Sequence, residues 1–442
     1  MFKTLANAFK VKEIRTKILF TLLMLVVVRI GSLLPIPGID SGYFGRMFSG
    51  IKGLEFLNQA TGDALTRGSV FALSIGPYIT SSIIMQLLTI AIPKLEEMQK
   101  DGEDGRKKIA SITRYVTVAL ALIESIAMVV GFANQGLIDG YKTMNTGEKI
   151  FSCVMTVAIL TAGSALLMWI GEQITEKGVG NGISIVLLIN IISSIPDDFN
   201  SLYKLFIKGQ SVLNATIAIV AIVVIILGVV ILTVILCDGE RRIPVQYSKK
   251  IQGRKTYGGQ SSHIPLKVNT AGVMPVIFAQ SLLSVPMVIA SFFNVDYNSV
   301  GGKILLGLSS QNWFNRANMI YSLGAIVYIA LIIFFAYFYT SISFNPIEIA
   351  NNMKKSGGFI PGIRPGKPTS DYLTKILNKI ILIGAVGLTI VAIIPIICSG
   401  LFNANVSFGG TSIIIIVGVV LETFRQIESQ MVVRDYKGFL ND

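Results

Sequence analysis

Few residues of this 442-residue chain could carry out covalent, acid–base or metal chemistry. The only histidine is His263, and the three cysteines, Cys153, Cys237 and Cys398, lie inside or at the end of apolar runs. This spacing forms neither a metal site nor a disulfide framework, so the cysteines are predicted to be small buried side chains. The sequence also lacks a G-x-x-x-x-G-K-[ST] phosphate-binding loop. We therefore expect no catalytic residue, no metal ligand, no cofactor and no enzyme activity.

Very few ionisable residues lie deep within the long apolar runs; Arg29 lies late in the first run and Glu124 lies midway through the third. Ion-coupled transporters place several carboxylates or histidines within the membrane, where they relay protons or bind ions. One carboxylate without a histidine is too little for such a pathway, and also for an intramembrane protease that uses histidine or paired aspartates. The function must therefore come from how the apolar segments are arranged.

The composition indicates that lipid is the main solvent of these segments. Apolar residues make up 52% of the chain and charged residues 14%, whereas about a quarter of a soluble domain is charged. A run of about 20 apolar residues is long enough to cross a bilayer. Ten runs are predicted to be spans: 18–34, 69–92, 111–133, 149–171, 182–195, 212–237, 270–293, 318–341, 376–397 and 410–427. The fifth is short and is expected to end at Pro196.

The basic residues indicate how the spans are oriented. If the N-terminus is cytoplasmic, the inside segments hold 26 Lys and Arg residues and the outside segments hold 9. Basic loops are retained in the cytoplasm, and an even number of spans returns the chain to its starting side. Both termini are therefore predicted to be cytoplasmic. The first run lacks a small-residue cleavage site, so we expect it to be a span and not a signal peptide.

The spans divide into two sets of five around an outside loop at 196–211. Because five is odd, the second set crosses the membrane in the opposite orientation, as in an inverted repeat. The predicted fold is an all-α polytopic membrane protein with two inverted five-helix halves. The expected divisions are an N-terminal half at 1–195, an external hinge loop at 196–211, a C-terminal half at 212–430 and a cytoplasmic tail at 431–442.

Three polar or amphipathic segments do not fit a simple bundle. The inside loops 238–268 and 345–375 are long and basic, which either reflects topology alone or forms a docking surface for an acidic partner or RNA. The outside segment 54–67 has helix-like apolar spacing but is too short and polar to span. It is predicted either to lie on the membrane surface or to fold back into the protein as a re-entrant piece.

Six stretches resemble the SecY family, the central subunits of bacterial protein-translocation channels. They are RIGSLLPIPGID (29–40), SVFALSIGPYITSSIIMQLL (69–88), GEQITEKGVGNGIS (171–184), HIPLKVNTAGVMPVIFA (263–279), NNMKKSGGFIPGIRPG (351–366) and FGGTSIIIIVGVVLETFRQIESQ (408–430). The resemblance implies a channel that passes unfolded secretory polypeptides across the plasma membrane and releases membrane-protein segments sideways into lipid. The outside loops and the span at 212–237 carry little of it.

The resemblance also implies a central pore whose waist is a ring of apolar side chains. The matching positions are Ile75, Ile79, Ile183, Leu187, Ile277 and Ile415. Leu187 departs from the isoleucine usual in the family without a change in polarity. By spacing alone, residues four apart such as Ile75 and Ile79 share a helix face, which is typical of a core or lipid-facing surface. A narrow apolar constriction excludes ions, whereas aliphatic side chains can part around a polypeptide.

Segment 54–67 corresponds in the family to the plug, a half-helix that fills the outer funnel of the idle channel. Its candidate residues are Leu54, Phe56, Leu57, Gly62 and Leu65. The resemblance places a lateral gate toward lipid between spans 2 and 3 on one side and spans 7 and 8 on the other. Polar residues at that seam, Gln86 and Asn269, either set how easily it opens or simply form hydrogen bonds between helices.

The resemblance makes the long basic loops a docking site for the ribosome and the motor ATPase SecA. Arg364 is expected to matter most for motor-driven export, followed by Arg254 and Lys255. Arginine forms bidentate contacts with carboxylate or phosphate that lysine reproduces poorly. The further partners implied are the small subunits SecE and SecG, secretory precursors with signal sequences, and membrane lipid.

Two other functions compete with the channel. A secondary transporter for a small solute is compatible with ten spans and inverted repeats, but it needs polar binding groups at mid-membrane, where these positions are aliphatic. A membrane scaffold that recruits partners through its basic loops leaves the plug-like segment and the aliphatic stripes without a role. The residues therefore favour a passive protein-conducting channel driven by a partner.

Overall fold

The computed structural model describes residues 8–42, 61–133, 136–208, 211–247, 250–252, 255–257, 261–291, 299–314, 319–402 and 410–438. Its long helices are α2 (Lys12–Leu33), α5 (Gly76–Ala91), α7 (Glu103–Phe132), α8 (Thr146–Lys177), α9 (Gly182–Phe206), α10 (Val212–Asp238), α11 (Met274–Ser291), α13 (Leu323–Ser343), α15 (Lys367–Phe402) and α16 (Gly410–Gly438). The shorter helices are α6 (Pro93–Lys100), α12 (Val300–Leu308), α14 (Pro346–Lys355), η2 (Ser310–Asn312) and η3 (Met319–Ser322). The strands are β1 (Glu240–Tyr247), β2 (Lys250–Gln252), β3 (Lys255–Tyr257), β4 (Ser261–Lys267) and β5 (Gly358–Phe359).

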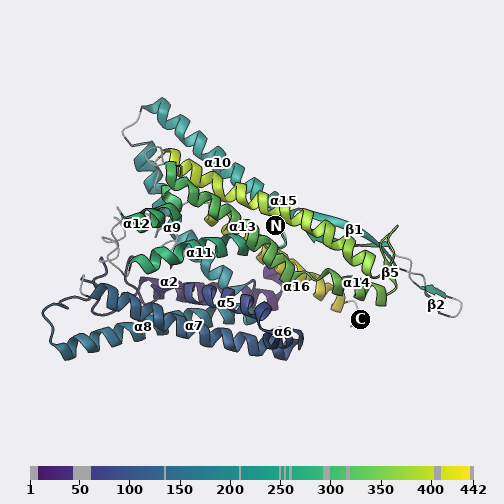
Figure 1. Ribbon diagram of the computed structural model, residues 1–442, viewed down its shortest axis with the longest axis horizontal. Helices are drawn as coiled ribbons and strands as arrows, with labels where there is room; N and C mark the ends of the chain where they lie inside the picture. Colours follow the sequence, from purple (N-terminus) through teal and green to yellow (C-terminus); the bar gives the residue numbers. More distant parts are fainter. Residues whose placement is uncertain are drawn as a thin grey trace.

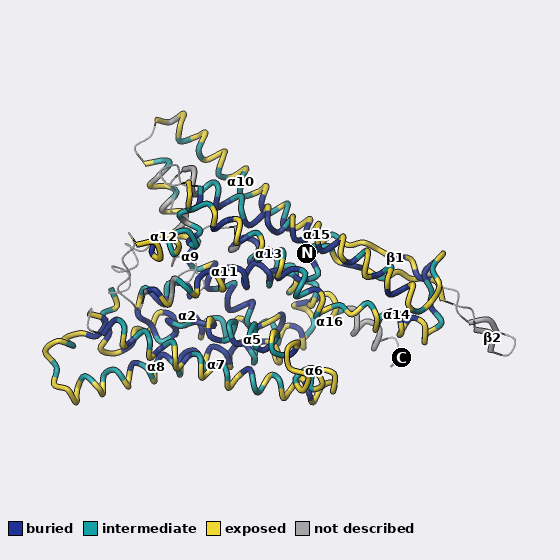
Figure 2. The backbone as a smooth tube through the Cα atoms, viewed as in Figure 1, coloured by how far each residue is buried: buried dark blue, intermediate teal, exposed yellow. Residues whose placement is uncertain are grey.

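A helix occupies each of the ten apolar runs that the sequence predicts to be spans. Among the described residues, seven helices are long and apolar enough to cross a membrane, and the pair α5–α6, bent by 101°, would make an eighth. Helices α11 and α16 occupy the other two runs. The outward faces of the long helices are exposed (Figure 2), and on α10 they carry apolar residues such as Leu213, Val220 and Ile231. An extended apolar exterior of this kind is suited to lipid.

Two prolines lie within the predicted spans or at their ends, and only Pro196 departs from the sequence prediction. The fifth span does not end at Pro196, because α9 continues through it to Phe206, so much of the predicted 196–211 loop is helical. A proline is tolerated inside a membrane helix when its neighbours satisfy the freed backbone groups. Pro77 lies in the first turn of α5. Its missing N–H needs no partner there, and residues 69–75 form turns before it.

The long helices form two groups (Figure 1). One contains α2, α5, α7 and α8, and the other contains α10, α11, α13, α15 and α16. Helix α9 packs against α2 and α8 of the first group and against α10 and α16 of the second. The two groups therefore meet along α9.

A small antiparallel sheet, which the sequence analysis did not expect, joins the two long basic loops. Its strand order is β4–β1–β5, with Arg242 opposite Pro265 and Gln246 opposite Phe359. The side chains that the sheet, α14 and the start of α15 bury together include Ile243, Val245, Leu266, Met353, Ile360 and Leu373. We call β1, β4, β5, α14 and the first turns of α15 the platform, which lies at one end of the molecule (Figure 1).

Candidate functional site

The six residues predicted to form the waist lie in one apolar cluster. Four of them are buried: Ile75 and Ile415 are 1% exposed, Ile277 is 3% exposed and Leu187 is 4% exposed. Ile79 and Ile183 are partly buried and pack against the same cluster. They come from α5 and its N-cap, α9, α11 and α16, which belong to both groups of helices. Because no ring side chain has a polar atom, the ring can exclude water and ions but cannot recognise a particular sequence.

A strained turn positions Ile75 at the start of α5. Ser74 has φ +52°, a left-handed conformation that is unusual for a residue with a side chain. Two helices hold this turn in place: Ser164 of α8 donates to the Ser74 carbonyl oxygen at 3.2 Å, and Asn190 Nδ2 of α9 donates to Ser74 Oγ at 3.3 Å. The Ile79 N–H then donates to the Ile75 carbonyl at 3.0 Å, so both residues follow one helical path.

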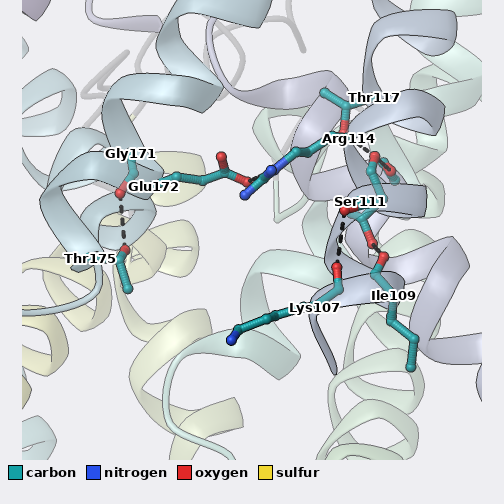
Figure 3. Close-up of polar contacts among 10 residues, drawn as sticks. Lys107, Ile109, Ser111, Arg114, Thr117, Gly171, Glu172 and Thr175 are labelled. Atoms are coloured by element: carbon teal, nitrogen blue, oxygen red, sulfur yellow. Dashed lines mark hydrogen bonds and ion pairs between the residues drawn. The ribbon is translucent and has the colours of Figure 1, made fainter. Parts of the chain in front are cut away.

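A tight turn at 178–182 positions Ile183 and Leu187 at the start of α9. The Thr175 hydroxyl donates to the Gly171 carbonyl at 3.0 Å (Figure 3) and accepts the Gly182 N–H at 2.9 Å. A Cβ atom at Gly182 would lie 1.9 Å from the Gly171 carbonyl oxygen, so only glycine fits this approach. The Asn181 side chain caps the helix by accepting from the N–H groups of Ile183 and Ser184.

Helix α16 closely approaches Val273, the residue that precedes α11. The Ile277 N–H donates to the Val273 carbonyl at 3.2 Å in the first turn of α11. A Cβ atom at Gly418 would lie 2.6 Å from Val273 Cγ1, so a larger residue on α16 would push the two elements apart. Gly418 lies within one helical turn of Ile415, and the approach therefore fixes both waist residues.

The described end of the predicted plug begins with one helical residue, Thr61, and then continues as turns. Residues 62–68 form successive turns in which Gly62 and Asp63 are both left-handed, with φ of +61° and +64°. Gly62 is buried, Ala64 belongs to the waist cluster, and Leu65 is 7% exposed in a second apolar cluster. The other plug candidates, Leu54, Phe56 and Leu57, lie outside the described residues.

The hydrogen bonds of the two predicted gate residues do not cross between α5 or α7 and α11 or α13. Gln86 Nε2 of α5 donates to Ser82 Oγ one turn earlier at 3.4 Å, and its buried Oε1 has no hydrogen-bond partner among the described residues. Asn269 Nδ2 lies 3.9 Å from Cys237 Sγ at the end of α10. Neither contact joins α5 or α7 to α11 or α13, so the structure does not bring the two residues together.

Arg364 is exposed on a rigid turn of the platform. The Thr369 hydroxyl donates to the Arg364 carbonyl at 2.8 Å, and the Ile363 N–H donates to the Ile360 carbonyl at 3.0 Å. The backbone is therefore fixed while the guanidinium remains accessible. Lys255 lies in β3, and Arg254 lies outside the described residues.

An ion pair joins two helices of the first group. Arg114 Nε of α7 donates to Glu172 Oε1 of α8 at 2.7 Å (Figure 3), which ties these two helices together. Across the described ranges, no group of three or more His, Cys, Asp or Glu side chains could hold a metal ion. The six predicted waist positions carry only aliphatic side chains.

Comparison with known families identifies the chain. The SecY family model matches residues 69–424, most of the sequence. The chain belongs to the SecY family. The SecY protein translocase subunits of Streptomyces coelicolor and Halalkalibacterium halodurans are 44% and 42% identical to it, with 100% of each chain covered. The resemblance that the six stretches indicated is thereby confirmed.

Solved SecY-like channels have the same fold. A SecY channel whose plug domain stabilises its closed state matches with a TM-score of 0.64 at 18% identity, over 95% of this chain and 92% of that one. Sec61 from the canine ribosome–channel complex matches with a TM-score of 0.59 at 17% identity, over 95% of this chain and 93% of that one. The chain is thus an all-α polytopic membrane protein of the SecY type, and it functions as a protein-translocation channel.

The sequence analysis missed the residues that hold the waist in place. Ser74, Ser164 and Asn190 are small polar residues in apolar runs, and Thr175 lies just after one. Each forms a hydrogen bond at a turn that carries a predicted waist residue. Polar residues within a membrane helix signal a partner, since lipid offers none. Their positions before Ile75 and on either side of Ile183 could have marked them, but their partners are distant in sequence.

Proposed function

We propose that the six waist residues form the constriction through which an unfolded secretory polypeptide passes. One observation carries this proposal: the six aliphatic side chains, which come from both groups of helices, belong to a single hydrophobic cluster. A closed ring of this kind is dry and blocks ions. Aliphatic side chains have no fixed hydrogen bonds to break, so they can move aside for chains of any sequence.

The waist is sealed on its outer side by the segment that contains the 61–68 turn. Ala64 packs into the waist cluster and Leu65 packs into the neighbouring one, so this turn bridges both. In the structurally similar SecY channel, the plug domain stabilises the closed state and maintains a membrane seal. If 54–67 has the same role, this explains why a segment that is too polar to span the membrane lies beside the pore.

The lateral gate lies between α5 and α7 on one side and α11 and α13 on the other. Signal sequences would enter there, and membrane-protein segments would leave by partitioning into lipid. The buried Gln86 Oε1 supports this proposal, because an acceptor without a partner favours an opening in which it meets water or a passing chain. Asn269, on the loop before α11, would tune the opposite edge.

The platform is the docking surface for the partners that drive transport. It presents the exposed side chains of Lys354, Lys355 and Arg364 on a folded base, which suits acidic protein surfaces and RNA phosphates. We infer that SecA and the translating ribosome bind here, with Arg254 and Lys255 contributing. Structural relatives are seen with ribosomes, namely canine Sec61 and the yeast Ssh1 complex.

The remaining features of the proposal concern the assembly in the membrane. Both termini face the cytoplasm of a bacterial cell, and the chain spans the plasma membrane. Residues near 196–211 act as the external hinge between the halves, and SecE and SecG complete the complex. The chain itself is not an enzyme: its energy comes from partners, which agrees with a waist that has no titratable side chain.

Site-specific photocrosslinking to a stalled secretory precursor tests the waist. Probes at Ile79, Ile277 and Ile415 should label the precursor, whereas a probe at Val220, which is 56% exposed on the outer face of α10, should label lipid. Labelling of lipid or of the protein's own helices alone, with the precursor demonstrably engaged, would remove the pore assignment. Polar solute labelling at the waist would instead favour a transporter.

A further inference from the structure

We propose that Arg29 is a positioning residue that holds the 61–68 turn against the outer side of the waist and so keeps the resting channel closed to ions. This inference deepens the proposed function and rests on it. Arg29 interrupts the apolar run of α2 and is only partly exposed. A charged side chain at such a position is unfavourable in lipid, and it usually has a functional partner inside the protein.

The partner of Arg29 is the backbone of the turn. Arg29 Nη1 donates to the Gly62 carbonyl oxygen at 3.3 Å. A Cβ atom at Gly62 would lie 2.7 Å from Arg29 Nη1, 3.0 Å from Asn190 Cα and 3.0 Å from Ser193 Oγ. The turn is therefore held between α2 and α9, directly beyond the helical turn that carries Leu187. Gly62 cannot bear a side chain there, since its φ is +61° and the space is filled.

The turn also carries charged side chains that act on Arg29. Burial disfavours the charge of the Arg29 guanidinium, the Asp63 carboxylate offsets part of this effect, and the Arg67 guanidinium adds to it. Hydrogen bonds that involve an ionised group are stronger than neutral ones. If the turn moves away, Arg29 loses its hydrogen bond to the Gly62 carbonyl in an apolar helix. That loss favours the seated turn by about tenfold to a hundredfold in the ratio of closed to open channels.

The seated turn acts on the waist through its apolar residues. Ala64 is fully buried in the waist cluster, and Leu65 packs with Ile36 and Leu137 in the second cluster. Arg29 therefore does not touch the translocating chain. It fixes the position of a segment that covers the waist, which distinguishes it from a residue that merely stabilises α2.

Halide efflux from proteoliposomes tests this inference on the full-length chain with its co-purified membrane subunits. Arg29→Met should raise the resting efflux about tenfold to a hundredfold. Arg29→Lys should restore part of the seal, because lysine keeps the charge but not the planar fork. Asp63→Asn should raise efflux less than Arg29→Met, since the hydrogen bond to Gly62 remains. Glu124→Gln removes another ionisable residue of an apolar run and should leave efflux unchanged.

Two controls separate this inference from the proposed function. Ile415→Asn should leak if the waist is the barrier, and export of a precursor by the unsubstituted chain tests the channel itself. If Ile415→Asn leaks but Arg29→Met is as tight as the unsubstituted chain, Arg29 does not position the seal and the proposed function stands. Equal leaks from Arg29→Met and Arg29→Lys, with an equal fall in unfolding temperature, would also overturn it by showing a structural role.

Discussion

Replacing Ile415 with asparagine should make the resting channel permeable to ions. Ile415 is 1% exposed and packs among the other waist residues. Burial of an isoleucine side chain is worth about 1.5–3 kcal/mol, and burial of an amide without a partner costs about 1–3 kcal/mol. The substitution therefore shifts the balance from a dry to a hydrated waist by about 3–6 kcal/mol. This corresponds to roughly two to four powers of ten in the hydrated population.

Halide efflux from sealed vesicles measures the hydrated population directly. The matched control is Ile415→Leu, which keeps volume and polarity and should change the balance by less than about 1.5 kcal/mol. Both variants should be compared at equal reconstituted protein and with similar unfolding temperatures. If Ile415→Asn is folded and as tight as Ile415→Leu, the apolar cluster is a packing core and not the ion barrier, and the reasoning is wrong.

Three further substitutions test the parts that surround the waist. Arg364→Glu should reduce SecA-driven export in reconstituted vesicles severalfold without changing insertion, because the exposed guanidinium is lost and its sign reversed; normal export would contradict the docking role. Gly182→Ala should destabilise the protein by about 1–3 kcal/mol, because its Cβ would meet the Gly171 carbonyl at 1.9 Å, and an unchanged unfolding temperature would argue against this packing. Thr175→Val removes the bond to the Gly182 N–H and should cost about 1 kcal/mol, a milder fall in the same thermal unfolding assay.

The positions of the membrane helices could be predicted because the signal is local. Each long apolar run must satisfy its backbone within itself in lipid, and a helix is the structure that does so. This is why all ten predicted runs contain helices, including the short run before Pro196. The waist residues followed from the family stretches, and the structure brings all six into one cluster.

The features that could not be predicted depend on partners distant in sequence. Strand β1 forms because it pairs with β4 and β5, and β5 is more than 100 residues away in sequence. Pro77 reads equally well as a kink or as the start of a helix, and the Ser74 turn, held by Ser164 and Asn190, decides between them. Pro196 remains helical because its context in α9 outweighs its local preference.

The platform has a mechanical consequence for the channel. Helix α15 has 36 residues, about 54 Å at 1.5 Å per residue, which is far longer than the roughly 30 Å hydrocarbon layer. Its first turns pack against the sheet, so the sheet is connected to a helix that continues into the membrane. Strand β4 ends at Lys267, a short turn before α11, which carries Ile277. A motor that tilts the sheet would thus also move α11, which forms a wall of the pore. Driving the polypeptide and opening the waist would then be coupled.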